Sequence, residues 1–136
     1  GGSGSDTGWF NRPTYLQYLN HKLYVSDSLN ARIQVFNELN DSIQVIGKRG
    51  LYIGDFSRPK GVAVDSDGNI YVTETYYDHL LIYNAEGEFL MAIGGSGSQP
   101  GQFAQPTAIW IDNHDRLFVS DMLNSRISIF QYLGDN

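Results

Sequence analysis

The sequence consists of three similar units that follow one another at a spacing of 46 to 47 residues. A phenylalanine, followed three residues later by a proline, marks each unit; the pairs are Phe10 and Pro13, Phe56 and Pro59, and Phe103 and Pro106. A regular repeat of this length is typical of proteins that build one fold from successive copies of a small structural unit. The 136-residue chain is therefore expected to form one domain with repeats at 1–46, 47–93 and 94–136.

The middle unit shows what each repeat is expected to contain. Four short segments, rich in β-branched and aromatic residues and bounded by turn residues, predict strands at 61–65, 69–74, 79–84 and 88–93. Gly68 and Gly87 stand at two of the junctions, where a tight turn needs a positive φ. No segment carries the 3.6-residue apolar period of an amphipathic helix. The sequence therefore predicts an all-β fold.

The predicted strands are apolar on both faces, as residues 108–111 illustrate with the run Ala-Ile-Trp-Ile. Strands of this kind must be covered on both sides. A four-stranded unit of 40 to 50 residues that packs between two similar units is the blade of a β-propeller. We therefore expect three four-stranded blades per chain.

The residue pattern of the repeat resembles that of a known protein family. Residues 54–65 read Gly-x-Phe-x-x-Pro-x-Gly-Val-Ala-Val-Asp, residues 67–72 read Asp-Gly-Asn-Ile-Tyr-Val, and residues 30–36 read Asn-x-Arg-Ile-x-Val-Phe. This pattern is similar to that of the NHL-repeat β-propeller family, and the likeness extends over essentially the whole chain. The resemblance implies blades around a central axis, with strand a innermost and strand d outermost. It also implies that the d-to-a loops and the b-to-c loops share one rim, here called the top face. These loops are expected at 1–12, 47–58 and 94–105, and at 27–32, 74–79 and 121–126.

Charge and composition exclude several classes of partner. The net charge of −6 predicts repulsion from phosphate backbones and anionic lipid, so we expect neither nucleic acid nor a membrane as partner. A few cations, Arg12, Lys48, Arg49 and Arg58, gather near the top loops. The absence of cysteine removes thiolate metal sites and disulfides. The sequence predicts a soluble chain, and the family resemblance favours an extracytoplasmic location.

The first and third units share a motif that we interpret as structural. Asp27 and Arg32, and likewise Asp121 and Arg126, stand at the two ends of a predicted b-to-c loop, where their side chains could meet. A pair that recurs at equivalent places in two blades is more typical of a structural ion pair than of a catalytic site. Asn30 and Asn124 are expected to be turn residues, since Asn tolerates left-handed geometry and caps loops through its side-chain amide.

The middle unit departs from this motif and supplies the candidate binding site. Its predicted loop gathers a carboxylate pair, two phenols and an imidazole, in the residues Glu74, Tyr76, Tyr77, Asp78 and His79. Exposed aromatic residues with polar ends are frequent in binding hot spots, so this loop could contact a protein or a small ligand. The alternative is that the tyrosines cover a neighbouring blade.

Catalysis finds less support in the sequence. His21 and His114 fall in predicted turns on the rim opposite His79, so the three histidines cannot readily share a metal. NHL-like propellers include an amidating lyase that relies on a metal held by axial histidines, a set that is not recognisable here. We therefore expect no catalytic residues, no metal and no cofactor. The alternative is a metal-dependent enzyme, similar to a lyase or lactonase, with an axial site.

The number of blades leads to a prediction about assembly. Three blades would leave the first and last with an apolar face open to water, and the residues after Leu133 are too few for a fourth strand in the last blade. Two copies would supply six blades, the number most typical of NHL-like rings. We therefore expect a non-catalytic scaffold or binding module, natural fragment or engineered, whose partner is a second copy of itself.

Overall fold

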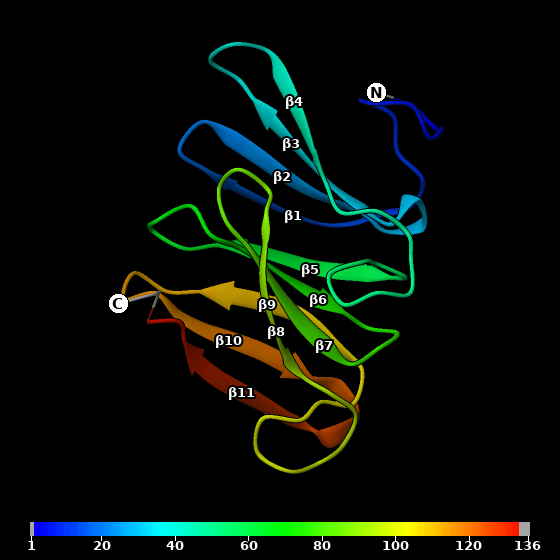
Figure 1. The fold of residues 1–136 in the computed structure, drawn as a ribbon. Helices are drawn as coiled ribbons and strands as arrows, with labels where there is room; N and C mark the ends of the chain where they lie inside the picture. The colour runs from blue at the N-terminus through cyan, green and yellow to red at the C-terminus, as the bar shows by residue number, and fades with distance from the viewer. Residues whose placement is uncertain (1, 134–136) are drawn as a thin grey trace.

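The computed structural model describes residues 2–133 as three antiparallel β-sheets arranged side by side (Figure 1). The first sheet contains β1 (Pro13–Leu19), β2 (Lys22–Asp27), β3 (Arg32–Asn37) and β4 (Ser42–Ile46). The second contains β5 (Pro59–Val64), β6 (Ile70–Glu74), β7 (His79–Tyr83) and β8 (Phe89–Gly94). The third contains β9 (Pro106–Ile111), β10 (Arg116–Asp121) and β11 (Arg126–Gln131). Single 3-10 turns, η1 (Ser28–Asn30) and η2 (Met122–Asn124), follow β2 and β10.

The sheets are the blades of a propeller, as the repeat predicted. Within each sheet the strands are paired in chain order, and the first strands, β1, β5 and β9, lie next to one another (Figure 1). In the middle blade the observed strands differ from the predicted ones by at most two residues at either end. Within residues 2–133 the third blade has three strands and lacks the outer one, as expected. The residues after Leu133, on which part of that expectation rests, lie outside the described residues, as does residue 1.

In the middle and last blades, the turn between the first two strands is built around one aspartate, Asp65 or Asp112. Asp65 accepts hydrogen bonds from the backbone N–H groups of Asp67 and Asn69, at 3.0 and 2.9 Å. Gly68 completes this turn with a φ of 84°, and Gly87 has a φ of 86° in the turn before β8. Both glycines therefore have the positive φ that the sequence required of them.

The core lies between the blades, and each repeat phenylalanine fills the same place in it. Phe56 packs against Tyr83, with the ring centroids 5.7 Å apart, and Phe103 packs in the same way against Phe130. Both phenylalanines are fully buried, because a blade lies on either side of each. Phe10 has its own blade on one side through Phe36 but is only half-buried.

Hydrogen bonds near the axis fasten each blade to the next. The hydroxyl of Ser28 donates to the carbonyl oxygen of Pro59 at 2.7 Å, and the hydroxyl of Thr75 donates to that of Pro106 at 2.8 Å. Gly61 lets β5 approach β9, because a Cβ at this position would lie 2.4 Å from the Thr107 carbonyl oxygen. The innermost strands are therefore held at fixed positions relative to one another.

The outer faces of the first and third blades, here called the end faces, are apolar and exposed. Leu16 on β1 is 68% exposed, whereas Val62, its counterpart on β5, is 3% exposed beneath the first blade. Ile127 and Ile129 on β11 are 60% and 62% exposed, although the equivalent Leu80 and Ile82 are fully buried. The first end face also carries Tyr18, Ile43 and Val45, and the last end face carries Trp110. Each end face therefore has the composition of a surface that packs against another blade.

Candidate functional site

The loop after β2 is organised by a buried ion pair. The Nε atom of Arg32 lies 2.8 Å from Oδ2 of the fully buried Asp27. The same guanidinium donates to the backbone carbonyl oxygens of Asp6 and Trp9, at 3.0 and 2.9 Å. The backbone N–H of Asn11 donates to Oδ1 of Asp27 at 2.7 Å. The pair therefore attaches the segment that precedes β1 to the end of β2.

The third blade repeats this arrangement. Nε of Arg126 lies 2.8 Å from Oδ2 of Asp121, and the guanidinium also donates to carbonyl oxygens of the loop before β9. Burial alone would raise the pKa of Asp121. Hydrogen bonds from the Ala104 N–H, the Asn124 amide and the Arg126 guanidinium outweigh it, so the pKa lies below its ordinary value.

The asparagines of this motif are turn residues whose side-chain amides cap the loops, as expected, but neither has the left-handed geometry that asparagine tolerates. The residues with positive φ are Ala31 and Ser125, each at 53°, one position after Asn30 and Asn124. Both asparagines are the last residues of their 3-10 turns. The amide of Asn30 is 2.8 Å from the Gly4 carbonyl oxygen and 2.9 Å from Oδ2 of Asp27. The asparagine side chain thus binds the loop that precedes β1, and the next residue, Ala31, has the left-handed backbone conformation.

In the middle blade Glu74 takes the place of the aspartates, and backbone N–H groups occupy its carboxylate oxygens. Its carboxylate is fully buried and accepts hydrogen bonds from the N–H groups of Ser57, Arg58 and Tyr76, at 2.9 to 3.0 Å. Burial raises the pKa of Glu74, and the three N–H groups oppose this only in part. Glu74 therefore holds the preceding loop in place and does not face the surface.

The rest of the predicted loop divides between packing and exposure. Asp78, with a φ of 57°, accepts hydrogen bonds from the Gln105 N–H at 2.7 Å and from the Ser96 hydroxyl. The half-buried Tyr77 ring lies between Tyr76, at 5.0 Å, and His79, at 6.5 Å. Tyr76 is 67% exposed. The five residues are therefore neighbours, but they do not form one cluster aimed at a ligand.

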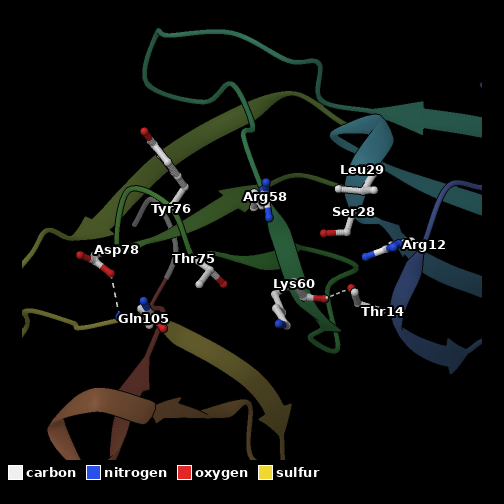
Figure 2. Close-up of a pocket in the computed structure, with 10 residues that line it drawn as sticks. All are labelled: Arg12, Thr14, Ser28, Leu29, Arg58, Lys60, Thr75, Tyr76, Asp78 and Gln105. Carbon is white, nitrogen blue, oxygen red and sulfur yellow. Dashed lines mark hydrogen bonds between the residues drawn. The ribbon is translucent and has the colours of Figure 1, made fainter.

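Tyr76 and Asp78 also line a hollow of about 700 Å³ on the top face, beside the first residues of β1 and β5 (Figure 2). Arg12, Arg58 and Gln105 each immediately precede a repeat proline, so every blade contributes the same position. The remaining lining residues are Thr14, Ser28, Leu29, Lys60, Thr75, Tyr76 and Asp78. A cavity of this volume is in the range that small molecules occupy.

Positive charge dominates this hollow, which we call the axial hollow. Arg12, Arg58 and Lys60 contribute three cations, and Asp78 contributes one carboxylate. The sequence had singled out Arg12 and Arg58 as cations near the top loops, but it had not connected them with Lys60. The signal that could have done so is their offset from the repeat prolines: Arg12 and Arg58 precede a proline, and Lys60 follows one.

The histidines are separated as predicted. His21 and His114 lie in the turns between the first two strands of their blades, whereas His79 begins β7 at the other rim. Nδ1 of His21 is 2.6 Å from Oε1 of Glu38, which also accepts the Tyr18 hydroxyl. Within the described part of the chain, no group of three or more His, Cys, Asp or Glu residues could hold a metal ion. No helix in residues 2–133 has the length and apolar character needed to cross a membrane.

A family model described as a six-bladed β-propeller matches residues 62–134, more than half of the chain. No curated protein matches the sequence. Among solved structures, a streptogramin B lyase is similar with a TM-score of 0.70 at 14% identity, covering 91% of this chain and 39% of that one. A catalytically inactive variant of virginiamycin B lyase from Staphylococcus aureus, with quinupristin, gives a TM-score of 0.63 at 14% identity, covering 90% and 42%.

A third similar structure comes from Bacteroides fragilis and is classed as a candidate exported protein. It has a TM-score of 0.70 at 21% identity, covering 99% of this chain and 38% of the other. The chain therefore spans about two fifths of the length of the solved structures that it matches. At these levels of identity the likeness establishes the propeller fold alone.

Proposed function

The chain belongs to the six-bladed β-propeller family, and from its three blades we infer that it acts as a half-propeller, a non-catalytic scaffold that closes into a ring with a second copy of itself. The blades are of the NHL type in this proposal, which the motifs of residues 54–72 support. The top face of the closed ring then serves as the binding surface for a protein or a small ligand.

The observation that carries this proposal is the pair of end faces. Leu16 and Tyr18 are exposed on the first end face, whereas the corresponding residues of the middle blade are covered by a preceding blade. Ile127 and Ile129 are exposed on the last end face, although their counterparts are covered by a following blade. The two end faces are thus the two sides of one kind of interface, which occurs twice within the chain.

Pairing of two copies would use the interface that already joins the blades. The last end face of one copy would meet the first end face of the other, and a two-fold axis would repeat the contact. Burial of apolar surface contributes about 25 cal/mol per Å², so two such contacts favour the closed ring over two open arcs. The first contact would also cover the exposed side of Phe10, as Phe56 and Phe103 are covered.

The structural similarity to two lyases does not lead us to propose a reaction for this chain. Their identity to this chain is 14%, and a propeller scaffold hosts many unrelated functions. The proposed role therefore rests on the end faces and the axial hollow of this chain.

Light scattering on a sizing column tests the ring. At micromolar concentration we expect a single species with twice the 15.2 kDa mass of one chain. A folded monomer, or a species of three or more copies, would contradict closure by two half-propellers.

A matched pair of variants locates the contact. Ile129→Asp places a charge at the centre of the last end face and should convert the dimer into monomer or unfolded chain. Leu51→Asp introduces the same charge at an 88% exposed position in the loop between β4 and β5, away from both end faces, and should leave the mass unchanged. Equal effects of the two substitutions would argue against the end faces as the interface.

A further inference from the structure

We propose that the axial hollow binds a small ligand carrying carboxylate or phosphate groups, an inference that rests on the proposed role of the chain as a non-catalytic binding module. The hollow gathers the side chains of Arg12, Arg58 and Lys60 at the inner ends of β1 and β5 (Figure 2). Guanidinium and ammonium groups are the side chains that proteins use most to bind such oxyanions.

The cations of the axial hollow differ from the other arginines in having no partner for their side chains. Arg32, Arg116 and Arg126 each form an ion pair with an aspartate at 2.7 to 2.8 Å. Within residues 2–133, the charged groups of Arg12, Arg58 and Lys60 form no hydrogen bond or ion pair. These three groups therefore retain their donors for a ligand, in a chain that is acidic overall.

The one carboxylate in the lining is already occupied. Asp78 accepts hydrogen bonds from the Gln105 N–H at 2.7 Å and from the Ser96 hydroxyl. These contacts disperse its negative charge and direct its oxygens toward the loop before β9. The hollow thus keeps an excess of positive charge, which attracts anions of matching size.

The walls of the hollow are fixed before any ligand arrives. The hydroxyls of Ser28 and Thr75 donate to the proline carbonyl oxygens of the next blade, and that of Thr14 donates to the Lys60 carbonyl oxygen at 3.1 Å. A preformed wall lowers the entropic cost of binding. Leu29 and the exposed ring of Tyr76 complete the rim with apolar surface, which suits a ligand with an apolar or aromatic body beside its anionic groups.

Calorimetric titration of the full chain at low ionic strength tests the inference, with pyrophosphate, citrate and uncharged glucose as probes. We expect at least one of the two anions to bind with a Kd of about 1 mM or lower, and glucose not to bind. Stronger binding of pyrophosphate would identify phosphate as the ligand group, and stronger binding of citrate would identify carboxylate. Binding of both would support the shared oxyanion chemistry.

Two double variants with the same change in net charge locate the site. Arg58→Gln with Lys60→Gln should weaken anion binding by about tenfold or more, because each lost charged contact removes a directional interaction. Lys22→Gln with Lys48→Gln removes two cations outside the hollow and should change the affinity by less than about threefold.

Several results would overturn the proposal: no binding of either anion up to about 10 mM, binding of glucose as strong as that of the anions, or equal weakening in the two double variants. Light scattering on the same samples separates this outcome from failure of the ring. An unchanged mass without anion binding would contradict the ligand site alone, and a monomer that still binds the anions would contradict the ring alone.

Discussion

At the scale of single residues, the same position carries two carboxylates with opposite electrostatic consequences. Asp121 and Glu74 both end the second strand of their blade, are fully buried and accept backbone N–H groups. Asp121 also has the guanidinium of Arg126 at 2.8 Å, and its pKa is lowered. Glu74 has no such partner among the described residues, and burial raises its pKa. The Asn124 amide and the Arg126 guanidinium add to the Ala104 N–H at Asp121, so hydrogen bonding and charge outweigh burial there, whereas burial outweighs hydrogen bonding at Glu74.

The first prediction concerns the stability that Asp121 provides. Asp121→Asn removes the negative charge beside Arg126 and weakens the acceptor for the Ala104 N–H, so the free energy of unfolding should fall by about 1–3 kcal/mol. Chemical denaturation at fixed protein concentration measures the difference. Asp67→Asn, at an exposed position in a turn, is the control and should cost less than about 0.5 kcal/mol. A neutral Asp121→Asn substitution would contradict the structural role of the pair.

The second prediction concerns pH. Because the pKa of Asp121 is lower in the folded protein than its ordinary value of 3.8, its contribution is complete above that value and is lost as the pH falls through the lower folded pKa. Denaturation curves between pH 7 and strongly acid conditions should therefore show a steeper acid loss of stability in the wild type than in Asp121→Asn. Parallel curves for the two proteins would show that Asp121 is not responsible.

The sequence predicted which side chains pair in these loops, but it did not predict the backbone conformation around them. The spacing of Asp27 and Arg32 was enough to place the two side chains near each other, because a short loop between paired strands brings its ends together. The amide cap of Asn30 was predictable from its side-chain chemistry, but the left-handed residue of the turn is Ala31, which no side-chain property marks. Glu74 was expected in a surface loop, and nothing in its own sequence context indicates that the backbone of a preceding loop covers it.

At the scale of elements, β5 and β9 of neighbouring blades approach each other closely at Gly61. Gly61→Ala would place a Cβ 2.4 Å from the Thr107 carbonyl oxygen, so the two strands would have to separate. The free energy of unfolding should fall by about 1–3 kcal/mol, as is usual for overpacking. Gly4→Ala is the matched control, because its Cβ would meet Trp9 at an ordinary contact distance of 3.6 Å. Thermal denaturation of the two variants gives the comparison, and equal stability would contradict a close contact at Gly61.

The two tyrosines of the loop between β6 and β7 are expected to behave differently. Tyr76 lines the axial hollow and is largely exposed, so Tyr76→Ala should weaken ligand binding while changing stability by less than about 1 kcal/mol. Tyr77 is half-buried between Tyr76 and His79, so Tyr77→Ala should cost more stability than Tyr76→Ala. Calorimetric titration and thermal denaturation of both variants test the distinction, which a greater stability loss in Tyr76→Ala would refute.

The elements themselves were largely predictable, whereas the hollow was not. Strands such as β6 and β7 were predictable because β-branched residues and turn glycines mark their bounds. The axial hollow combines positions such as Arg12, Lys60 and Gln105, of which each lies 45 to 48 residues from the next. Only the curvature that brings the inner strands together makes them neighbours, and that curvature is a property of the assembled blades.

At the scale of the whole molecule, the proposed closure by association would link stability to concentration. If two copies form one ring, the melting temperature should rise as the protein concentration is raised, because mass action favours the associated folded state. Calorimetric scans over a hundredfold range of concentration test this expectation. Ile129→Asp should abolish the dependence or lower the melting temperature throughout, and a constant melting temperature in the wild type would contradict association.

The third blade also determines how the chain must be handled. Within residues 2–133 the outer edge of β11 has no neighbouring strand, whereas the equivalent strands β3 and β7 are paired on both sides. Along its segment Arg126–Gln131 half-buried and exposed residues alternate, and two exposed isoleucines lie on one face. An unpaired edge of this composition can add further strands without limit, which is how fibrils grow. Closure of the proposed ring would cover the isoleucines and compete with this growth, so slow dilution during refolding should favour rings, and rapid concentration of unfolded chain should favour aggregates.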